Sequence, residues 1–381
     1  MTKYRIPFNK PSFAGNETRY IAEAIERGHI SGDGHFTKAC HKLLEESVGV
    51  PRALLTTNCT HALEMSGFLV GLEPGDEVIV PSFAFVTTVL AFVLRGAKPV
   101  FCDVRADTLN LDETQLEQLI TKKTKAIVTL HYAGVACEMD AILAIAARHG
   151  IPVIEDNAHG LFAKYKGRQL GTLGLLATQS FHETKNFTCG EGGALFINDR
   201  SLIERAEILR EKGTNRSRFM RGLVHKYTWV DVGSSYLPSD MLAAFLLAQL
   251  EARDEIQAKR GAIWKRYARE LAGWAAERGV SLPHVPQHCE QPFHMFYLLM
   301  KSGAQREALI THLEERGILA VFHYLPLHMS DMGKKFGGRE GDCPVTENVS
   351  GRLLRLPFFN RLTDAEQGEV IEAVKSLPAS S

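Results

Sequence analysis

Short apolar runs alternate with helix-length segments from about residue 52 to residue 199. The runs end in polar residues or glycine, as strands do when a sheet buries them on both faces. The expected strands cover residues 53–55, 77–80, 99–103, 126–130, 153–156 and 194–197. Because helical segments such as 140–149 separate them, the pattern predicts an α/β fold with a mainly parallel sheet and helices on both faces.

A different pattern follows residue 240. A long helical stretch, roughly 240–274, precedes a strand at 294–299 and a helix at 306–316. The chain has 381 residues, 45% of them hydrophobic, which exceeds the size at which one core stops growing. We therefore expect a large domain over residues 1–253, including the N-terminal segment, and a smaller C-terminal α/β domain over residues 254–381.

The composition excludes several classes of partner. Lys and Arg total 44, as do Asp and Glu, so no net charge favours nucleic acid or an anionic membrane. The seven cysteines are scattered, with neither a CxxC pair nor a spacing suited to zinc, which fits a reducing cytoplasm and predicts no metal site. No window approaches a membrane span, and the polar N-terminus lacks a signal peptide. These features predict a cytoplasmic protein.

Polar residues at the strand ends suggest the chemistry. In open α/β sheets, ligands bind beyond the carboxyl ends of the strands. Asp156 closes one apolar run, and Ser180 and Lys185 lie in a polar turn downstream. An acid, a serine and a lysine in this setting can hold pyridoxal 5'-phosphate (PLP) by its ring nitrogen, phosphate and aldehyde carbon. The sequence predicts a PLP enzyme.

Lys185 and Asp156 would carry the reaction. The Lys185 amine would bind the cofactor covalently and then move protons between substrate and cofactor carbons. The Asp156 carboxylate would keep the pyridine nitrogen protonated, so that the ring can accept electrons. Taken alone, a loop lysine is usually a solvated charge, and an acid at a strand end usually caps a helix. Their occurrence together favours the cofactor.

Further residues are candidates for the cofactor site. His159 would bond the phenolic oxygen or the acid, and Phe85 would cover the ring face. Backbone amides at a helix start, with hydroxyl groups, would bind the phosphate. The expected phosphate ligands are Cys59, Thr60 and Ser180. The ordinary alternatives are a packing histidine, a core aromatic residue and a helix cap.

A basic run in this neutral chain could engage a diphosphate. Its members are Arg210, Lys212, Arg216, Arg218 and Arg221. The ordinary alternative is a solvated loop.

Taken together, these residues resemble the sugar aminotransferases of the DegT/DnrJ/EryC1/StrS family. The similarity runs from residue 6 to about residue 377. It is carried by Ser31-Gly32-Asp33-Gly34, by residues 131–140, 181–186 and 211–217, and by Phe322-His323-Tyr324. The resemblance implies the fold type I (aspartate aminotransferase-like) architecture of PLP enzymes.

The resemblance also implies roles for residues. Lys185 would be the Schiff-base lysine, with Asp156 at the pyridinium and His159 where the family often has glutamine. Family members are homodimers with active sites at the subunit interface. Many carry Gly-Tyr-Asn-Tyr-Arg where this chain has Gly-Ser-Ser-Tyr-Leu at 233–237, so the asparagine that reaches the neighbour's phosphate is missing. Ser235 is the expected substitute, and the 4-transaminase group of the family shares this version.

The implied reaction is transamination of a nucleotide sugar. L-Glutamate would leave pyridoxamine 5'-phosphate (PMP) and 2-oxoglutarate, and the C4 ketone of a dTDP-4-dehydro-6-deoxyhexose would become the amine of a dTDP-4-amino-4,6-dideoxyhexose. The substrate contacts are expected at Arg216, His323 and Tyr324. The configuration at C4, galacto or gluco, and UDP in place of dTDP both stay open.

Three alternatives remain. A related PLP-dependent sugar dehydratase carries histidine at the lysine position, and Lys185 argues against it. Another fold type I activity, such as aldol cleavage, is the second. The third is a non-catalytic regulator that binds PLP or a nucleotide sugar, for which the acid, serine and lysine would have no use.

Overall fold

A seven-stranded sheet forms the centre of the computed structural model, which describes residues 4–378. The strand order is β1-β9-β8-β5-β4-β2-β3. The strands are β1 (Arg52–Thr56), β2 (Glu77–Pro81), β3 (Lys98–Cys102), β4 (Thr124–Leu130), β5 (Val153–Asp156), β8 (Leu176–Ser180) and β9 (Gly193–Ile197). Within this sheet only β9 opposes the others, since it pairs antiparallel with both β1 and β8. The predicted mainly parallel sheet is confirmed.

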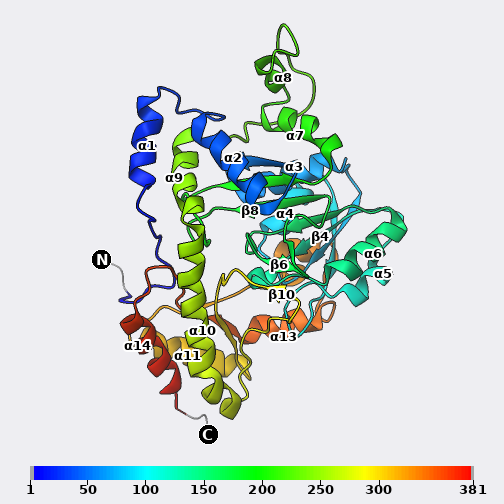
Figure 1. Cartoon of the computed structure of the whole chain (residues 1–381). Helices are drawn as coiled ribbons and strands as arrows, with labels where there is room; N and C mark the ends of the chain where they lie inside the picture. The colour runs from blue at the N-terminus through cyan, green and yellow to red at the C-terminus, as the bar shows by residue number, and fades with distance from the viewer. Residues whose placement is uncertain (1–3, 379–381) are drawn as a thin grey trace.

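Helices cover both faces of the sheet (Figure 1). Leu54 of β1 belongs to a core with α3 (Cys59–Leu69), α4 (Thr87–Val93) and α7 (Ile203–Arg210), whereas its neighbour Leu55 belongs to a core with α2 (His35–Val48) and α9 (Asp240–Glu251). This alternation follows from the two-residue period of a strand. A third core, under α5 (Leu116–Leu119) and α6 (Met139–His149), includes Ile127 and Val153.

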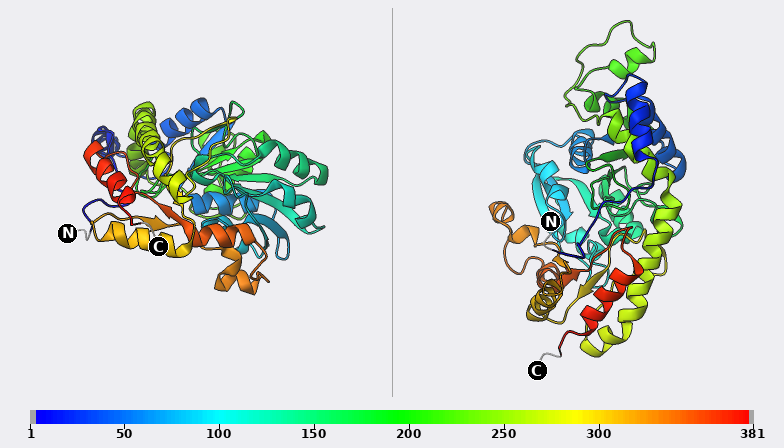
Figure 2. Two further views of the ribbon diagram at one scale, coloured as in Figure 1. Left: turned by 90° about the horizontal axis from the view of Figure 1, so that it is seen from below. Right: turned by 90° about the vertical axis from the view of Figure 1, so that its left-hand side faces the viewer.

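The C-terminal part of the chain has its own core. The expected helical stretch 240–274 is two helices, because the chain breaks at Ala252 between α9 and α10 (Arg253–Arg278). Helix α10 runs beside α14 (Asp364–Lys375), as Figures 1 and 2 show. The other elements here are β11 (Tyr297–Leu299), α11 (Gly303–Glu314), β12 (Val321–Phe322), α12 (Asp331–Lys335), α13 (Pro344–Arg352) and β13 (Leu353–Arg355).

This separate core supports the proposed division into residues 1–253 and 254–381, which stays a prediction. Its members come from residues 263–377, with Ile6 as the contribution of the N-terminal segment. Strands β11, β13 and β12 form an antiparallel sheet in that order. No helix among residues 4–378 is long and apolar enough to cross a membrane.

One segment projects from the body of the molecule. We call residues 214–229 the α8 arm, since they contain α8 (Arg216–Met220) and close through a bridge between Thr214 and Trp229. The arm extends beyond α7, away from the C-terminal helices (Figures 1 and 2). The remaining elements are α1 (Glu17–Glu26), β6 (Lys164–Tyr165), β7 (Arg168–Gln169) and β10 (Cys289–Glu290).

The Ser-Gly-Asp-Gly run at 31–34 has a structural role. Asp240, the first residue of α9, accepts hydrogen bonds from the amides of Phe36 (3.1 Å) and Thr37 (2.8 Å) in the first turn of α2. A Cβ atom on Gly34 would lie 2.3 Å from the Asp240 Oδ2 atom. Only glycine therefore lets the buried carboxylate reach the start of α2.

Replacing Gly34 with alanine should destabilise the protein, because the new methyl group displaces Asp240 from the α2 amides. We expect Gly34→Ala to lower the free energy of unfolding by about 2 kcal/mol or more. The matched control is Gly273→Ala in α10, where nothing lies within 4 Å. That change should raise stability by about 1 kcal/mol, the difference in helix propensity. Urea unfolding of the apo protein measures both, and equal effects would contradict the packing argument.

Candidate active site

Asp156 and Lys185 lie at the same edge of the sheet. Asp156 is the last residue of β5 and pairs with Leu130 of β4 and Thr178 of β8, both near the carboxyl ends of their strands. Strand β8 ends at Ser180, and the turn that follows carries Lys185, whose amide donates to the His182 carbonyl (2.9 Å). Parallel strands bring these residues together, although the whole segment 157–184, which includes β6, β7 and β8, separates them in sequence.

The Asp156 carboxylate is buried, with 3% of the residue exposed. Its Oδ2 atom accepts from the Thr88 hydroxyl (2.7 Å), and its Oδ1 atom accepts from the Ala158 amide (3.2 Å). Burial raises the pKa of Asp156, while these two donors and the positive charge of Lys185 act against that rise. A carboxylate held in this way is suited to face a cationic ring nitrogen.

The Lys185 amine has an altered affinity for its proton. Burial of the amine lowers the pKa of Lys185 to about 8, the Arg355 guanidinium acts in the same direction, and Asp156 acts against it. A lysine with this pKa is partly neutral at physiological pH, and the neutral form is the nucleophile.

The amino end of α3 lies beside this pair. Cys59 and Thr60 are the first residues of α3, so their amides have no partner within the helix. The Asn58 side chain caps the helix by accepting from the His61 amide (2.8 Å). The Cys59 thiol reaches the Thr178 hydroxyl on β8 (3.5 Å), which places the start of α3 next to the end of β8 and Ser180. This geometry suits a phosphate.

His159 forms a wall of the site. It is 5% exposed, and its ring stacks on His294 with centroids 4.3 Å apart and an angle of 20° between planes. The Nε2 atom lies 3.4 Å from the Tyr324 hydroxyl, and the buried Nδ1 atom has no partner among residues 4–378. Burial lowers the pKa of His159 well below its usual range, and Lys185 adds to the effect, so the ring is neutral.

Aromatic residues from both parts of the chain complete the wall. His323 is 8% exposed, and its Nδ1 atom lies 3.0 Å from the Tyr132 hydroxyl. Tyr324 packs its ring 5.6 Å from Phe83 and 6.3 Å from Phe85. Phe85 is 54% exposed, which leaves its ring free to cover a ligand.

Nine of the eleven predicted site residues therefore gather around one edge of the sheet, and their individual roles stay predictions. Arg216 and Ser235 do not join them within the chain. Arg216 lies on the α8 arm with Glu211 as its partner (3.4 Å), and the exposed Ser235 pairs with the backbone of Glu211. Among residues 4–378, no hydrogen bond or ion pair joins either of them to the other nine.

The expectation of one basic surface run was wrong for Arg210. Its side chain is buried, and it donates to the Leu55 carbonyl (2.7 Å) and to Asp33 (2.8 Å). Arg210 thereby ties α7 to β1 and to the Ser-Gly-Asp-Gly run, which is a structural duty.

Several site residues lack a signal in the sequence. Thr88, Thr178 and His294 contact the predicted residues, yet none of the three lies in a motif. Tyr132 also contacts a predicted residue, and it lies in the run 131–140 without having been given a role. Thr88 is the clearest case, because it lies in the first turn of a helix that is apolar from Val89 onward. The only indication in the sequence was a polar residue at a position of this helix that faces the core.

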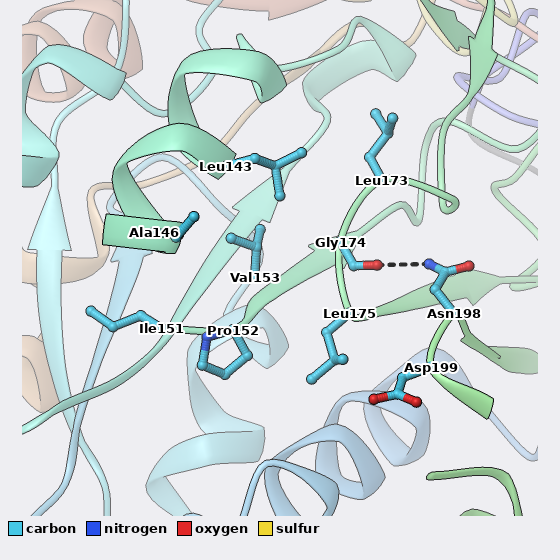
Figure 3. A pocket seen from close by; sticks show the side chains of 11 residues that line it. Leu143, Ala146, Ile151, Pro152, Val153, Leu173, Gly174, Leu175, Asn198 and Asp199 are labelled. Atoms are coloured by element: carbon cyan, nitrogen blue, oxygen red, sulfur yellow. Dashed lines mark hydrogen bonds between the residues drawn. The ribbon is translucent and has the colours of Figure 1, made fainter. Parts of the chain in front are cut away.

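A hollow of about 350 Å³ lies away from these residues (Figure 3). It is lined by Leu143 and Ala146 of α6 and by residues that precede β5 and β8, such as Pro152 and Leu175. These positions are at the amino ends of the strands, the edge opposite Asp156. Its lining is mostly apolar, with no lysine or histidine, so it offers no place for the predicted chemistry.

The fold and the site define an aminotransferase of the fold type I class. The chain belongs to the DegT/DnrJ/EryC1/StrS aminotransferase family, which matches residues 11–375. The predicted family, fold class and enzyme class are thus confirmed.

Known proteins resemble the chain along almost its whole length. It is 33% identical over 380 residues to spore coat polysaccharide biosynthesis protein SpsC of Bacillus subtilis, covering 98% of this chain and 97% of that one. It is 35% identical over 374 residues to GDP-perosamine synthase of Caulobacter vibrioides, covering 97% of each. Spr1654 of Streptococcus pneumoniae, solved in PLP and PMP forms, matches with 27% identity and TM-scores of 0.90 and 0.91, covering 98% of this chain and 98% and 99% of those chains.

Capture of PLP by the apo protein should depend on pH through Lys185. Because burial lowers the pKa of this amine to about 8, the rate constant should rise about tenfold per pH unit below pH 8 and level off above it. Stopped-flow absorbance follows the reaction, and the Lys185→Ala protein is the blank. A rate that keeps rising to pH 10, as for an ordinary lysine, would contradict the burial of the amine.

Proposed function

We propose that this protein is a PLP-dependent nucleotide-sugar aminotransferase. The observation that carries the proposal is the meeting of Asp156 and Lys185 at one edge of the sheet, beside the amino end of α3. The donor set fits the cofactor: Asp156 for the ring nitrogen, the first amides of α3 with Ser180 for the phosphate, and the free Nδ1 atom of His159 for the phenolic oxygen. The PLP and PMP forms of Spr1654 support both cofactor states.

The cofactor, when bound, supplies an electron sink for the carbon that loses its proton. The chain supplies the rest. Lys185, partly neutral at physiological pH, would take the proton from the substrate carbon and pass it to the cofactor carbon. Asp156 would hold the ring nitrogen in its cationic form. His159 and Tyr324 wall the site and exclude water, which strengthens each of these electrostatic contacts.

We further propose L-glutamate as the amino donor, leaving 2-oxoglutarate, and a dTDP-4-dehydro-6-deoxyhexose as the acceptor. The product is then a dTDP-4-amino-4,6-dideoxyhexose. The Gly-Ser-Ser-Tyr-Leu run at 233–237 supports this choice, because the 4-transaminase group shares it. A GDP-linked sugar is the second candidate, supported by the 35% identity to a GDP-perosamine synthase.

The proposal includes a cytoplasmic homodimer with an active site at the subunit interface. Two sets of exposed apolar side chains support the interface. The first set, on the α8 arm, is Phe219, Met220, Leu223, Tyr227 and Trp229. The second set, on α4 and on the residues that flank it, is Phe85, Val86, Leu90 and Leu94. Exposed apolar surface of this kind favours association, and a second chain would bring Arg216 and Ser235 toward the partner's site. All seven cysteines are free, which agrees with a reducing compartment.

Incubation with glutamate and either nucleotide sugar tests the activity. The wild-type protein should form 2-oxoglutarate and amino sugar in equal amounts from the dTDP substrate, and product NMR then gives the configuration at C4. Asp156→Asn should lower turnover about a hundredfold or more while PLP still binds, since the electron sink weakens. If the protein turns over the GDP sugar but not the dTDP sugar, the GDP-linked sugar is the acceptor. PLP binding without any product would favour the non-catalytic regulator.

The assembly should be a dimer in solution. Sedimentation equilibrium should give twice the 42.3 kDa chain mass. The double variant Leu223→Glu/Trp229→Glu places charges on the α8 arm and should dissociate the dimer and lower turnover. Met332→Glu on α12, which is also half-exposed, is the matched control and should leave the mass unchanged. A monomeric, fully active wild type would refute the shared site.

A further inference from the structure

His294 joins two parts of the candidate site. It lies just before β11, at the start of the strand expected over 294–299, where the sequence gave it no chemical role, and only 7% of it is exposed. One face of its ring stacks on His159, with centroids 4.3 Å apart. Its Nδ1 atom lies 2.9 Å from the Oδ1 atom of Asn186, the residue next to Lys185.

The hydrogen bonds around Asn186 define the tautomer of His294. The Asn186 Nδ2 atom donates to the Pro292 carbonyl (2.7 Å), so its Oδ1 atom must be the acceptor toward His294. The Nδ1 atom of His294 therefore carries a proton. Burial lowers the pKa of His294 well below its usual range, and His159 and Lys185 add to this effect, so the ring is neutral.

The backbone around His294 is held firmly by α10. Arg260 donates from Nε to the Phe293 carbonyl (2.9 Å), from Nη2 to the His294 carbonyl (2.5 Å) and from Nη1 to the Asn360 side chain (2.8 Å). Phe293 has a φ of +53°, an unfavourable conformation for a residue with a side chain. Its ring lies over Gly261, where a Cβ atom would be 3.0 Å away. The surrounding contacts thus impose one position on His294.

We propose that His294 is a positioning residue that sets the His159 ring through its face and the Lys185 turn through its Nδ1–H group. Because Arg260 fixes the backbone of His294, the C-terminal part of the chain determines the positions of both the His159 ring and the Lys185 turn. The stack aims the free Nδ1 atom of His159 at the cofactor's phenolic oxygen, and the Asn186 bond aims the Lys185 amine at the aldehyde carbon. The inference rests on the proposed PLP function.

Two substitutions separate the two contacts. His294→Phe keeps an aromatic face for His159 but removes the donor to Asn186. His294→Asn keeps a donor near the Nδ1 position but removes the aromatic face. The same two changes at His312, which lies on α11 and bonds the Ala373 carbonyl, are the matched controls.

Two measurements report on the two contacts. The rate constant for PLP capture by the apo protein reports on the Lys185 turn, and the pH titration of the bound cofactor's absorbance reports on the hydrogen bond from His159. His294→Phe should slow capture about fivefold to tenfold, the usual effect of losing one hydrogen bond, and leave the titration midpoint in place. His294→Asn should shift the midpoint toward that of His159→Ala and leave capture within twofold. Both His312 variants should match the wild type.

Other outcomes overturn the proposal. If both His294 variants change the two measurements equally, or change neither, His294 has no positioning role. Circular dichroism and thermal melting identify a variant that has merely lost its fold, and the other variant then decides. A wild-type protein that does not capture PLP would instead refute the proposed function itself.

Discussion

The buried carboxylate of Asp156 is the constraint on which the site depends. A carboxylate away from water is costly unless hydrogen bonds and positive charge compensate it. Thr88 and Ala158 give the bonds, and the charge of Lys185 helps to keep the group ionised. Because the carboxylate is incompletely neutralised, a cationic ring placed against it gains the remaining attraction. A cofactor with a cationic ring, when bound, would therefore complete the electrostatic balance around Asp156.

The site is complete only when the C-terminal part of the chain lies against the sheet. Buried polar contacts hold the two together. Asp103, which follows β3, accepts hydrogen bonds from amides at the start of α13. Ser82 bonds His328 (2.6 Å), and His328 bonds Glu347 (2.9 Å). Ser82, His328 and Glu347 are the residue types of a hydrolase triad. Because Ser82 and His328 are fully buried, no substrate can reach the serine, and the three residues hold the C-terminal part against the sheet.

Much of what depends on local order could be predicted from the sequence. Apolar runs predicted six strands of the large sheet but not β8 (Leu176–Ser180). Asp156 was found as the acid at a strand end, and Lys185 as the lysine of a polar turn, because ligands bind where parallel strands end. Thr88 and His294 could not be found in the same way. Thr88 meets Asp156 because α4 packs on the sheet in one orientation, and His294 meets His159 because the segment before β11 packs against the site. Both contacts join residues far apart in the sequence. The prediction that Arg210 belongs to an exposed basic run was wrong for a related reason. The sequence of such a run does not show which side chain points into the protein.

The central claim is that Lys185 anchors PLP. Reduction of the loaded protein with borohydride, followed by proteolysis and mass spectrometry, locates the cofactor directly. The account predicts the pyridoxyl group on the peptide that contains Lys185, and predicts that Lys185→Ala carries none. A label on another lysine, or labelling that survives in Lys185→Ala, would contradict it.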